Sequence, residues 1–459
     1  MLIDPQTGAV AIPVTAVTTE GLEAAAAALD AGQRAWVEAS GFTAKAGSTL
    51  LVPGAAGAVS AVLFGLGKEG APDADPLVAG RLSALPAGTY RLAGGFPDPS
   101  LAALAFALGG YRYTRYRTAE EGDTALEIPA EVDGAELRRT VAAVTLARDL
   151  INTPSNRLGP ADLAAAIREV AATHGATVAE TVGDALLTAG LPMIHTVGAA
   201  AIPERAPRLV DLAWGDPAAP KVTLVGKGVV FDTGGLDLKP SDAMLLMKKD
   251  MGGAANALAL AAMIMGAGLK LRLRLLVPAV ENAVSGAAFR PGDVLESRKG
   301  VSVEIGNTDA EGRLILGDAL TLASEEKPEL MIDFATLTGA ARVALGPDIP
   351  AVFTDDDTLA ADLARHSAAL GDPTWRLPLW APYAAMLESK VADINNAGTG
   401  GFAGSITAAL FLQRFVGEDI PWLHVDLYAW SRSSRPARPE GGDAQSIRAL
   451  YALLKERYR

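Results

Sequence analysis

Charged residues are concentrated in two short stretches of this sequence. The segment NTDAEGRL, 307–314, carries Asp309, Glu311 and Arg313 at every second position, directly before an apolar run. A capped helix is one explanation, because Thr308 and Glu311 fit a Thr-x-x-Glu capping box and acids favour a helix start. This explanation does not account for Arg313, since a cation in the first turn opposes the helix dipole. A metal site is the alternative.

The second stretch is GKGVVFDTGGLDLKPSDAMLLMKKDMGGAAN, 226–256. Lys227 lies between two glycines, Asp232 ends an apolar strand-like run, and Lys239 and Asp250 follow in loops. Flanking glycines let a ligand approach the backbone closely, and open α/β sheets place their sites at the carboxyl ends of strands. The segment matches neither a Walker A motif nor the GxGxxG dinucleotide pattern, so it does not indicate nucleotide binding.

The two stretches together supply four carboxylates near strand ends and loops. Clustered like charges repel one another unless cations neutralise them. Two divalent ions would balance four carboxylates, and a metal pair that activates a bridging water is a known hydrolytic device. The acids that we predict to form such a cluster are Asp232, Asp250, Asp309 and Glu311.

Three cations accompany these acids. Lys227 is either a counter-charge or, if two metal ions remove its proton, a nitrogen ligand. Lys239 is placed to stabilise a developing oxyanion. Arg313 is expected to bind a small anion or to orient a base.

Alternating strand and helix patterns must position these residues. Apolar strands at 221–231, 269–280, 329–339 and 421–430 alternate with helical patterns such as 254–268 and 312–324. This alternation predicts an α/β fold whose larger part has a mostly parallel central sheet covered by helices on both faces. We expect a small N-terminal α/β domain at 1–135, a linker helix at 136–151 and a catalytic domain at 152–459.

Composition excludes several classes of protein and site. The chain has 459 residues, a net charge of −13 and no cysteine, so thiol catalysis, disulfides and Cys-bound zinc are excluded. Its four histidines are scattered, and no basic run indicates nucleic-acid binding. The uncharged run Met251–Leu269 contains several glycines, so we interpret it as a buried core helix and not as a membrane span. The N-terminus shows no signal-peptide pattern, and we expect a cytoplasmic location.

Several motifs resemble those of one enzyme family, the leucyl (cytosol) aminopeptidases of peptidase family M17. NTDAEGRL is similar to the family's signature octapeptide, and VGKGVVFDTGG with Lys239 and MKKDMGGAA resembles a second long motif. NTPSN at 152–156 and DFATLTGA at 333–340 resemble family segments as well, so the resemblance covers most of residues 150–430. The N-terminal third is similar in size and α/β character only, which suggests a macro-like domain.

The resemblance implies a metal-dependent aminopeptidase with two divalent ions, Mn²⁺ or Zn²⁺, with Co²⁺ or Mg²⁺ also compatible. It implies that Asp232 and Glu311 bridge the ions, that Lys227 and Asp250 complete the tighter site, and that Asp309 completes the more exchangeable one. Substrates would be peptides with a free N-terminus, and the assembly would be a homohexamer built from two trimers.

The resemblance also implies roles around the metals. Lys239 would polarise the scissile carbonyl, and Arg313 would hold a bicarbonate that acts as general base. Met247, Thr336 and Gly339 would line the pocket for the N-terminal side chain of the substrate.

The segment HVDLYAWS, 424–431, departs from the family pattern. It places Tyr428 and Ser431 at positions where family members commonly carry a small residue and a Met. If these side chains face the pocket, it is narrower or more polar than usual, and a preference for leucine is in doubt. His424 on the same predicted strand is expected to be a structural core residue.

Two other classes remain as alternatives. A phosphoesterase could use the same acids, with Lys239 and Arg313 binding phosphate. A binding protein on an enzyme-like scaffold would be expected to have lost one of the predicted ligands, and none is lost.

Overall fold

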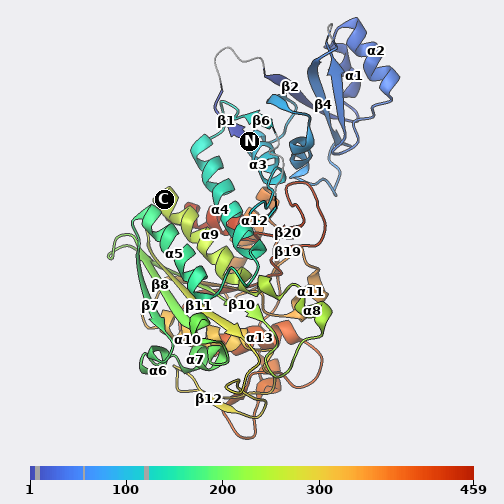
Figure 1. Cartoon of the computed structure of the whole chain (residues 1–459). Helices are drawn as coiled ribbons and strands as arrows, with labels where there is room; N and C mark the ends of the chain where they lie inside the picture. The colour runs from blue at the N-terminus through green and yellow to red at the C-terminus, as the bar shows by residue number, and fades with distance from the viewer. Residues whose placement is uncertain (6–10, 55–56, 118–122) are drawn as a thin grey trace. The chain divides into compact units, whose positions relative to one another are not determined.

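The computed structural model describes residues 1–5, 11–54, 57–117 and 123–459, which form two compact units (Figure 1). The N-terminal unit comprises residues 1–145 and 433–440, and the C-terminal unit comprises residues 146–432 and 441–459. Helix α4, Gly134–Asn152, contains the division between Thr145 and Leu146. The division of the sequence at residues 135 and 151 into three functional parts stays a prediction.

The N-terminal unit contains a six-stranded sheet of order β1-β6-β5-β2-β4-β3, parallel except for the β3–β4 pair. Its strands are β1 (Leu2–Ile3), β2 (Ile12–Thr18), β3 (Thr49–Pro53), β4 (Val59–Gly67), β5 (Gly88–Gly94) and β6 (Thr124–Glu127). Its helices, besides the first part of α4, are α1 (Leu22–Ala27), α2 (Ala31–Ser40), the 3₁₀ helix η1 (Val78–Ala84) and α3 (Pro99–Gly109).

The C-terminal unit is built on a nine-stranded sheet of order β16-β15-β18-β14-β9-β11-β8-β7, with β10 paired to β11. Its four central strands are parallel, and antiparallel pairs flank them. The strands are β7 (Thr177–Val182), β8 (Arg208–Trp214), β9 (Lys221–Gly226), β10 (Gly228–Asp232), β11 (Arg272–Asn282), β14 (Leu330–Ala335), β15 (Ala351–Phe353), β16 (Trp375–Arg376) and β18 (Trp422–Asp426).

Helices cover both faces of this sheet (Figure 1). The helices of this unit are α5 (Pro160–His174), α6 (Ala185–Thr188), α7 (Pro192–Gly198), η2 (Pro203–Arg205), α8 (Ser241–Met244), η3 (Met247–Met251), α9 (Gly252–Ala267), α10 (Gly312–Ser324), α11 (Gly339–Leu345), α12 (Asp357–Leu370), η4 (Ala381–Leu387), α13 (Gly404–Gln413) and α14 (Ile447–Arg457). There are also two small sheets. One consists of β12 (Val294–Glu296), β13 (Ser302–Glu304) and β17 (Ile394–Asn395), and the other consists of β19 (Trp430–Ser431) and β20 (Gly441–Gly442).

The central strands are apolar along their whole length, as expected for a parallel sheet covered on both faces. All six residues of β14 are buried, and in β9 every residue after Lys221 is buried. The predicted α/β class, with a smaller N-terminal and a larger C-terminal domain, is therefore confirmed. The run predicted as one strand at 221–231 is divided into β9 and β10 by Lys227, which changes the strand's partners at that residue.

Helix α9 is long and apolar enough, with η3, to cross a membrane by length and composition. It packs against β9, β14 and α14, and 83% of the most apolar 18-residue window of Met247–Ala267 is buried. Such burial is typical of a core helix, which is the interpretation that the sequence favours.

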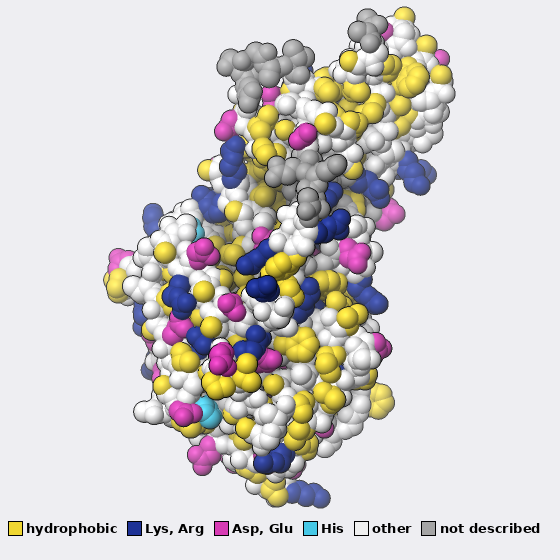
Figure 2. Space-filling model, in the orientation of Figure 1, with side chains coloured by type: hydrophobic (Ala, Val, Ile, Leu, Met, Phe, Trp, Pro, Cys, Tyr) yellow, Lys and Arg dark blue, Asp and Glu magenta, His cyan; other side chains and the backbone are white. Residues whose placement is uncertain are grey.

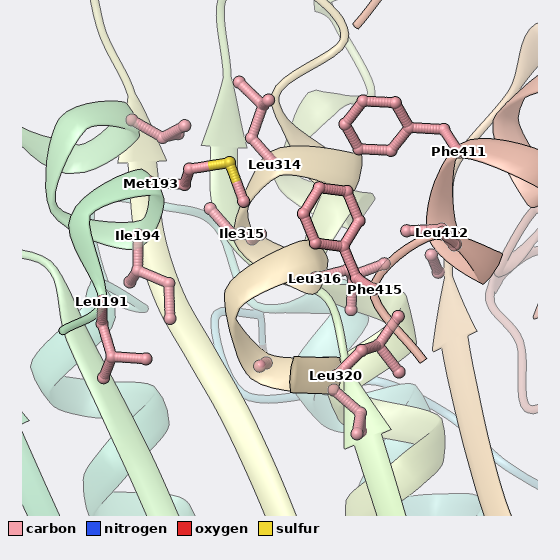
Figure 3. Packing of buried hydrophobic residues seen from close by; sticks show 14 of the residues in the cluster. Leu191, Met193, Ile194, Leu314, Ile315, Leu316, Leu320, Phe411, Leu412 and Phe415 are labelled. Atoms are coloured by element: carbon pink, nitrogen blue, oxygen red, sulfur yellow. The ribbon is translucent and has the colours of Figure 1, made fainter. Parts of the chain in front are cut away.

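Helix α10 is fixed by one large apolar cluster. Its residues Leu314, Ile315, Leu316 and Leu320 pack against α7 and α13 (Figure 3). The neighbouring side chains shown there are Leu191, Met193, Ile194, Phe411, Leu412 and Phe415. Close packing of this kind leaves α10 little freedom to move, so the residues at its N-terminus are held in place.

Basic and acidic side chains alternate with apolar ones over the face drawn in Figure 2. On that face the Lys and Arg side chains of the C-terminal unit do not merge into one basic field. Nucleic-acid-binding proteins typically carry a continuous basic patch, and this face does not show one.

Candidate metal centre and active-site cavity

Lys227 occupies the break between β9 and β10. Its backbone N–H donates to Phe334 O at 2.9 Å, which keeps the chain in register with β14, and its Nζ donates to Thr336 O at 3.0 Å. The stem of Lys227 requires a glycine at 312, because a Cβ there would lie 2.6 Å from Lys227 Cε. The start of α10 at Gly312 therefore lies in direct contact with Lys227 at the β9–β10 junction.

Two carboxylates meet the Lys227 amine in the interior. Its Nζ lies 2.6 Å from Asp250 Oδ2 and 2.9 Å from Glu311 Oε1. Burial disfavours the charged amine, but Asp250, Glu311 and Asp232 raise the pKa of Lys227 above its ordinary value. Burial also raises the pKa of Asp250 and, well above its ordinary value, that of Glu311. The carboxylates outnumber the amine, so the group lacks positive charge.

Lys239 binds the second half of the cluster. Its Nζ lies 2.8 Å from Asp232 Oδ2 and also contacts Asp309 Oδ1. Gly234 and Gly235 have φ values of +88° and +67°, and this left-handed turn folds the loop after β10 back toward the acids. Burial and the nearby Asp232 raise the pKa of Asp309 to about 6.

The donor atoms suit divalent cations. Carboxylate oxygens of Asp232, Asp309 and Glu311 all lie within 4.8 Å of one another, close enough to bind one ion. Asp250 Oδ2 and both carboxylate oxygens of Glu311 are buried without a hydrogen bond from any residue that the structure describes. Lys227 Nζ lies within ion-pair distance of both carboxylates, but its N–H groups are not oriented to donate a hydrogen bond to these oxygens. A buried carboxylate oxygen without a hydrogen bond raises the free energy of the folded state, and divalent cations bound to these oxygens would offset that penalty.

The capping-box interpretation of the 307–314 segment is wrong. The residue that precedes α10 is Glu311, and its side chain makes no capping hydrogen bond. Thr308 Oγ1 instead donates to Gly234 O at 2.6 Å, and Asp237 Oδ2 accepts the Thr308 backbone N–H at 2.7 Å. The threonine joins this loop to the glycine turn, which leaves the Glu311 carboxylate available to the cluster.

Arg313 is buried beside the acids on the first turn of α10. Its Nη1 donates to Asn396 O at 2.6 Å, whereas its Nε is buried without a hydrogen-bond partner among the described residues. Burial lowers the pKa of Arg313 to about 10, although Glu311 and Asp426 oppose that shift. The guanidinium therefore remains charged at neutral pH and retains a free donor.

A cavity of about 910 Å³ unites nearly all of the predicted site residues. Glu311 is fully buried and does not line the cavity. All the other residues predicted to bind metal, substrate or anion do: Lys227, Asp232, Lys239, Met247, Asp250, Asp309, Arg313, Thr336 and Gly339. Thr336 Oγ1 donates to Asp250 Oδ1 at 2.7 Å, so one candidate pocket residue also fixes a candidate ligand. Residues more than a hundred positions apart in the sequence thus line one space.

The two residues that depart from the family pattern lie in different places. Tyr428 lines the cavity, whereas Ser431 is buried in β19 and is not among the cavity-lining residues. Lys249, whose pKa burial lowers to about 8, lies with its Nζ 4.3 Å from the centre of the Tyr428 ring. Tyr428 and Met247 therefore line the same cavity, and a narrower substrate pocket stays a prediction.

Sequence reasoning missed two asparagines that organise the acids. Asn282 Nδ2 donates to Asp232 Oδ1 at 2.8 Å, and Asn396 Oδ1 accepts from Gly306 N at 2.8 Å. A polar residue at the end of the apolar β11 run was a signal for Asn282. Asn396 follows the two-residue strand β17, which is too short to predict from pattern alone. His424, as expected, is a core residue, with Nδ1 2.7 Å from Asp333 Oδ1.

Comparison with known proteins places this geometry in a family. The model of the cytosol aminopeptidase family catalytic domain matches residues 145–451, and that of the M17 aminopeptidase N-terminal domain matches residues 12–129. A probable cytosol aminopeptidase from Roseiflexus castenholzii is 38% identical over 453 residues, covering 92% of each chain.

Solved structures agree. The cytosol aminopeptidase of Coxiella burnetii is 45% identical, with a TM-score of 0.94 over 100% of this chain and 99% of that one. The bottromycin maturation enzyme BotP in complex with Mn is 35% identical, with a TM-score of 0.87 over 98% and 99%. The matched domains, the relatives and the acid cluster lead to one conclusion: the chain belongs to the cytosol aminopeptidase family, M17, of metal-dependent aminopeptidase hydrolases.

Proposed function

We propose that this chain releases N-terminal amino acids from peptides with the help of two divalent metal ions held by the acid cluster. The single observation that carries the proposal is the excess of buried carboxylate over cation. Asp250 Oδ2 and both carboxylate oxygens of Glu311 accept no hydrogen bond from the described residues. A carboxylate oxygen of Glu311 lies within 4.8 Å of those of Asp232 and Asp309, and Lys227 Nζ lies between Glu311 and Asp250. Two ions would supply the missing charge and use the unpaired oxygens as ligands.

The proposed ligand set is the one that the resemblance implies: Lys227, Asp232, Asp250, Asp309 and Glu311. Divalent cations held by these residues would lower the pKa of a bound water and polarise a carbonyl. They would also oppose the protonated form of Lys227, so its Nζ becomes a neutral donor when the ions are bound. Mn²⁺ and Zn²⁺ are the proposed ions, with Co²⁺ or Mg²⁺ compatible, and the manganese complex of the BotP relative supports Mn²⁺.

Lys239 and Arg313 are the proposed catalytic residues of the protein itself. Lys239 lines the cavity beside Asp232 and Asp309 and is placed to stabilise negative charge on the substrate's carbonyl oxygen. Arg313 offers its unpaired Nε to a small anion, for which we propose bicarbonate as general base. Met247, Thr336 and Gly339 are proposed to line the pocket for the first side chain of the substrate.

The resemblance supports three further proposals about the protein in the cell. The substrates are peptides with a free N-terminus, and the chain assembles as a homohexamer made of two trimers. The relatives' designation as cytosol aminopeptidases supports a cytoplasmic location.

Hydrolysis of aminoacyl-p-nitroanilides by the full-length protein tests this function. We expect turnover that a chelator abolishes and that Mn²⁺ or Zn²⁺ restores. Blocking the substrate's α-amine should abolish cleavage. Turnover of phosphoesters together with inactivity on every free-amine substrate would point to the phosphoesterase alternative and contradict the proposal.

A further inference from the structure

The cavity has a second group of cations that the acid cluster does not use. Lys227 and Lys239 are paired with the cluster's carboxylates. Lys249, Arg342 and Arg432 line the same cavity and contact none of those acids within ion-pair distance, nor any other acid that the structure describes. Lys249 and Arg342 both lie over the ring of Tyr428, with Nζ and Cζ 4.3 Å and 5.4 Å from its centre.

Lys249 is the unusual member of this group. The residue is only 5% exposed, and within the described part of the chain its ammonium makes neither a hydrogen bond nor an ion pair. Its polar contact is the face of Tyr428, which is a weak substitute for a counter-ion. An ammonium that lines a cavity on a largely buried residue and has no counter-ion has donors available for a ligand.

Tyr428 is held rigidly beside these cations. Its backbone N–H and that of Ala429 donate to Gln445 Oε1 at 3.1 Å and 2.9 Å. Ala429 has a φ of +58°, a left-handed conformation that alanine rarely adopts, so the turn is imposed by its surroundings. Gly252 is required there, because a Cβ on it would lie 2.4 Å from the Ala429 Cβ. The ring and the two cations therefore form a preformed wall.

We propose that this wall binds the side-chain carboxylate of an N-terminal glutamate or aspartate, which makes the chain an aminopeptidase that prefers acidic first residues. The inference rests on the proposed aminopeptidase function. A carboxylate would supply the counter-charge that Lys249 lacks, with Arg342 and Arg432 adding attraction from the exposed rim.

The position of Lys249 favours the first residue of the substrate over a later one. Lys249 directly precedes the candidate ligand Asp250 and lies two residues after Met247, which is proposed to contact the first side chain. Thr336, another residue of that pocket, is hydrogen-bonded to Asp250. A substrate whose α-amine is bound at the metals would therefore extend its first side chain toward Lys249.

The same wall disfavours leucine. An apolar side chain in this place would cover the Lys249 ammonium without pairing it, and the Tyr428 ring would reduce the room for a branched chain. A site built around a charged group discriminates strongly against a substrate that leaves that group unpaired.

The test compares glutamyl-, glutaminyl- and leucyl-p-nitroanilide with the Mn²⁺-loaded full-length protein. Glutamate and glutamine have the same size, so their ratio of kcat/KM isolates the charge. We expect glutamyl to exceed glutaminyl by about tenfold or more. Calorimetry should show tighter binding of free L-glutamate than of L-glutamine, which is a readout independent of turnover.

Two variants locate the effect. Lys249→Met keeps the side chain's length without its charge, and it should reduce the glutamyl-to-glutaminyl ratio by about tenfold. Arg342→Gln, at an exposed position where folding is not at risk, should reduce the ratio less. Lys248→Met is the matched control, because Lys248 donates to Asn152 O at 2.7 Å and does not line the cavity; its ratio should equal that of the wild type.

The outcomes separate this inference from the function on which it rests. Leucine hydrolysis without preference for glutamate over glutamine, or an unchanged ratio in both Lys249→Met and Arg342→Gln, overturns the inference alone. Hydrolysis of none of the three substrates overturns the aminopeptidase function and the inference together. A preference for a free C-terminus, as in Leu-Gly over Leu-Gly-amide, with no preference at the first residue would assign the cations to a later carboxylate and also overturn it.

Discussion

The acid cluster and the wall around Tyr428 line one cavity but are built in opposite ways. In the cluster, anions exceed cations, and Asp250 Oδ2 and both carboxylate oxygens of Glu311 accept no hydrogen bond from the described residues. In the wall, cations exceed anions, and the ammonium of Lys249 makes no ion pair in the described structure. Each region is therefore incomplete until it binds a ligand of opposite charge, a metal ion in one case and a substrate carboxylate in the other.

The comparison also separates what is common from what is particular. Every charged position of the cluster lies in a motif that resembles those of the family, so we propose that the cluster performs the chemistry that the family shares. Tyr428 departs from those motifs, so the wall accounts for selectivity particular to this chain. Substitutions in the cluster should therefore change metal content or turnover on all substrates, whereas substitutions in the wall should change the choice among substrates.

The largest effect is expected for Asp232→Ala. Asp232 is buried and contributes to both halves of the cluster, so its loss should release metal and lower kcat by at least roughly a thousandfold. Metal analysis and leucyl or glutamyl p-nitroanilide kinetics measure this. Asp242→Asn, at an exposed position of the cavity rim, is the control and should keep its metal. Full metal retention in Asp232→Ala would contradict the bridging role.

Lys239→Ala should rank second. The variant removes the cation that we propose to stabilise the substrate's carbonyl oxygen, so kcat should fall by about a hundredfold or more while metal content stays the same. Lys390→Ala, on the exposed surface, is a matched control with no expected effect. Loss of metal from the Lys239 variant would contradict the catalytic role and would indicate that Lys239 positions the metal-binding carboxylates.

Arg313→Ala should lower kcat by about tenfold to a hundredfold, because it removes the proposed anchor of the general base. The informative measurement is the response to bicarbonate. Wild-type activity should fall in carbonate-free buffer and recover when bicarbonate is added, whereas the variant should not respond. An equal response of both proteins would exclude Arg313 as the site of the anion.

Tyr428→Ala tests the wall and should have the smallest effect on total activity. Removal of the ring enlarges the pocket, so the ratio of leucyl to alanyl kcat/KM should rise by about tenfold. Tyr383→Ala replaces a tyrosine that does not line the cavity and should leave the ratio unchanged. A uniform loss on both substrates would mean that Tyr428 supports the cavity without selecting among side chains.

The sequence allowed the cluster to be predicted better than its surroundings. Motif spacing identified Asp232, Asp250, Asp309 and Glu311, and apolar runs identified strands and helices such as α10, predicted at 312–324 and found there. Their convergence follows from packing between separate segments, because Asp232 ends β10, Asp250 lies in η3, which packs against β10, and Glu311 directly precedes α10.

The remaining features depend on contacts between distant segments. The strand at 221–231 was predicted as continuous because apolar β-branched residues lie on both sides of Gly226-Lys227-Gly228, and the loss of pairing with β14 after this point is visible only in three dimensions. The capping box was plausible from residues 308–311 alone, but Thr308 is bonded to the Gly234–Asp237 loop, about seventy positions away. Lys249 was not singled out, because nothing in MKKD distinguishes the lysine that reaches Tyr428 from the one that reaches Asn152.

The central claim is that the acid cluster works by holding two divalent ions. Its most direct test is to remove metal from the full-length protein with a chelator, return Mn²⁺ stepwise, and measure bound metal by mass spectrometry together with aminopeptidase activity. The account predicts no activity without metal and full activity as binding approaches two ions per chain. Full activity in protein that contains no metal would contradict it.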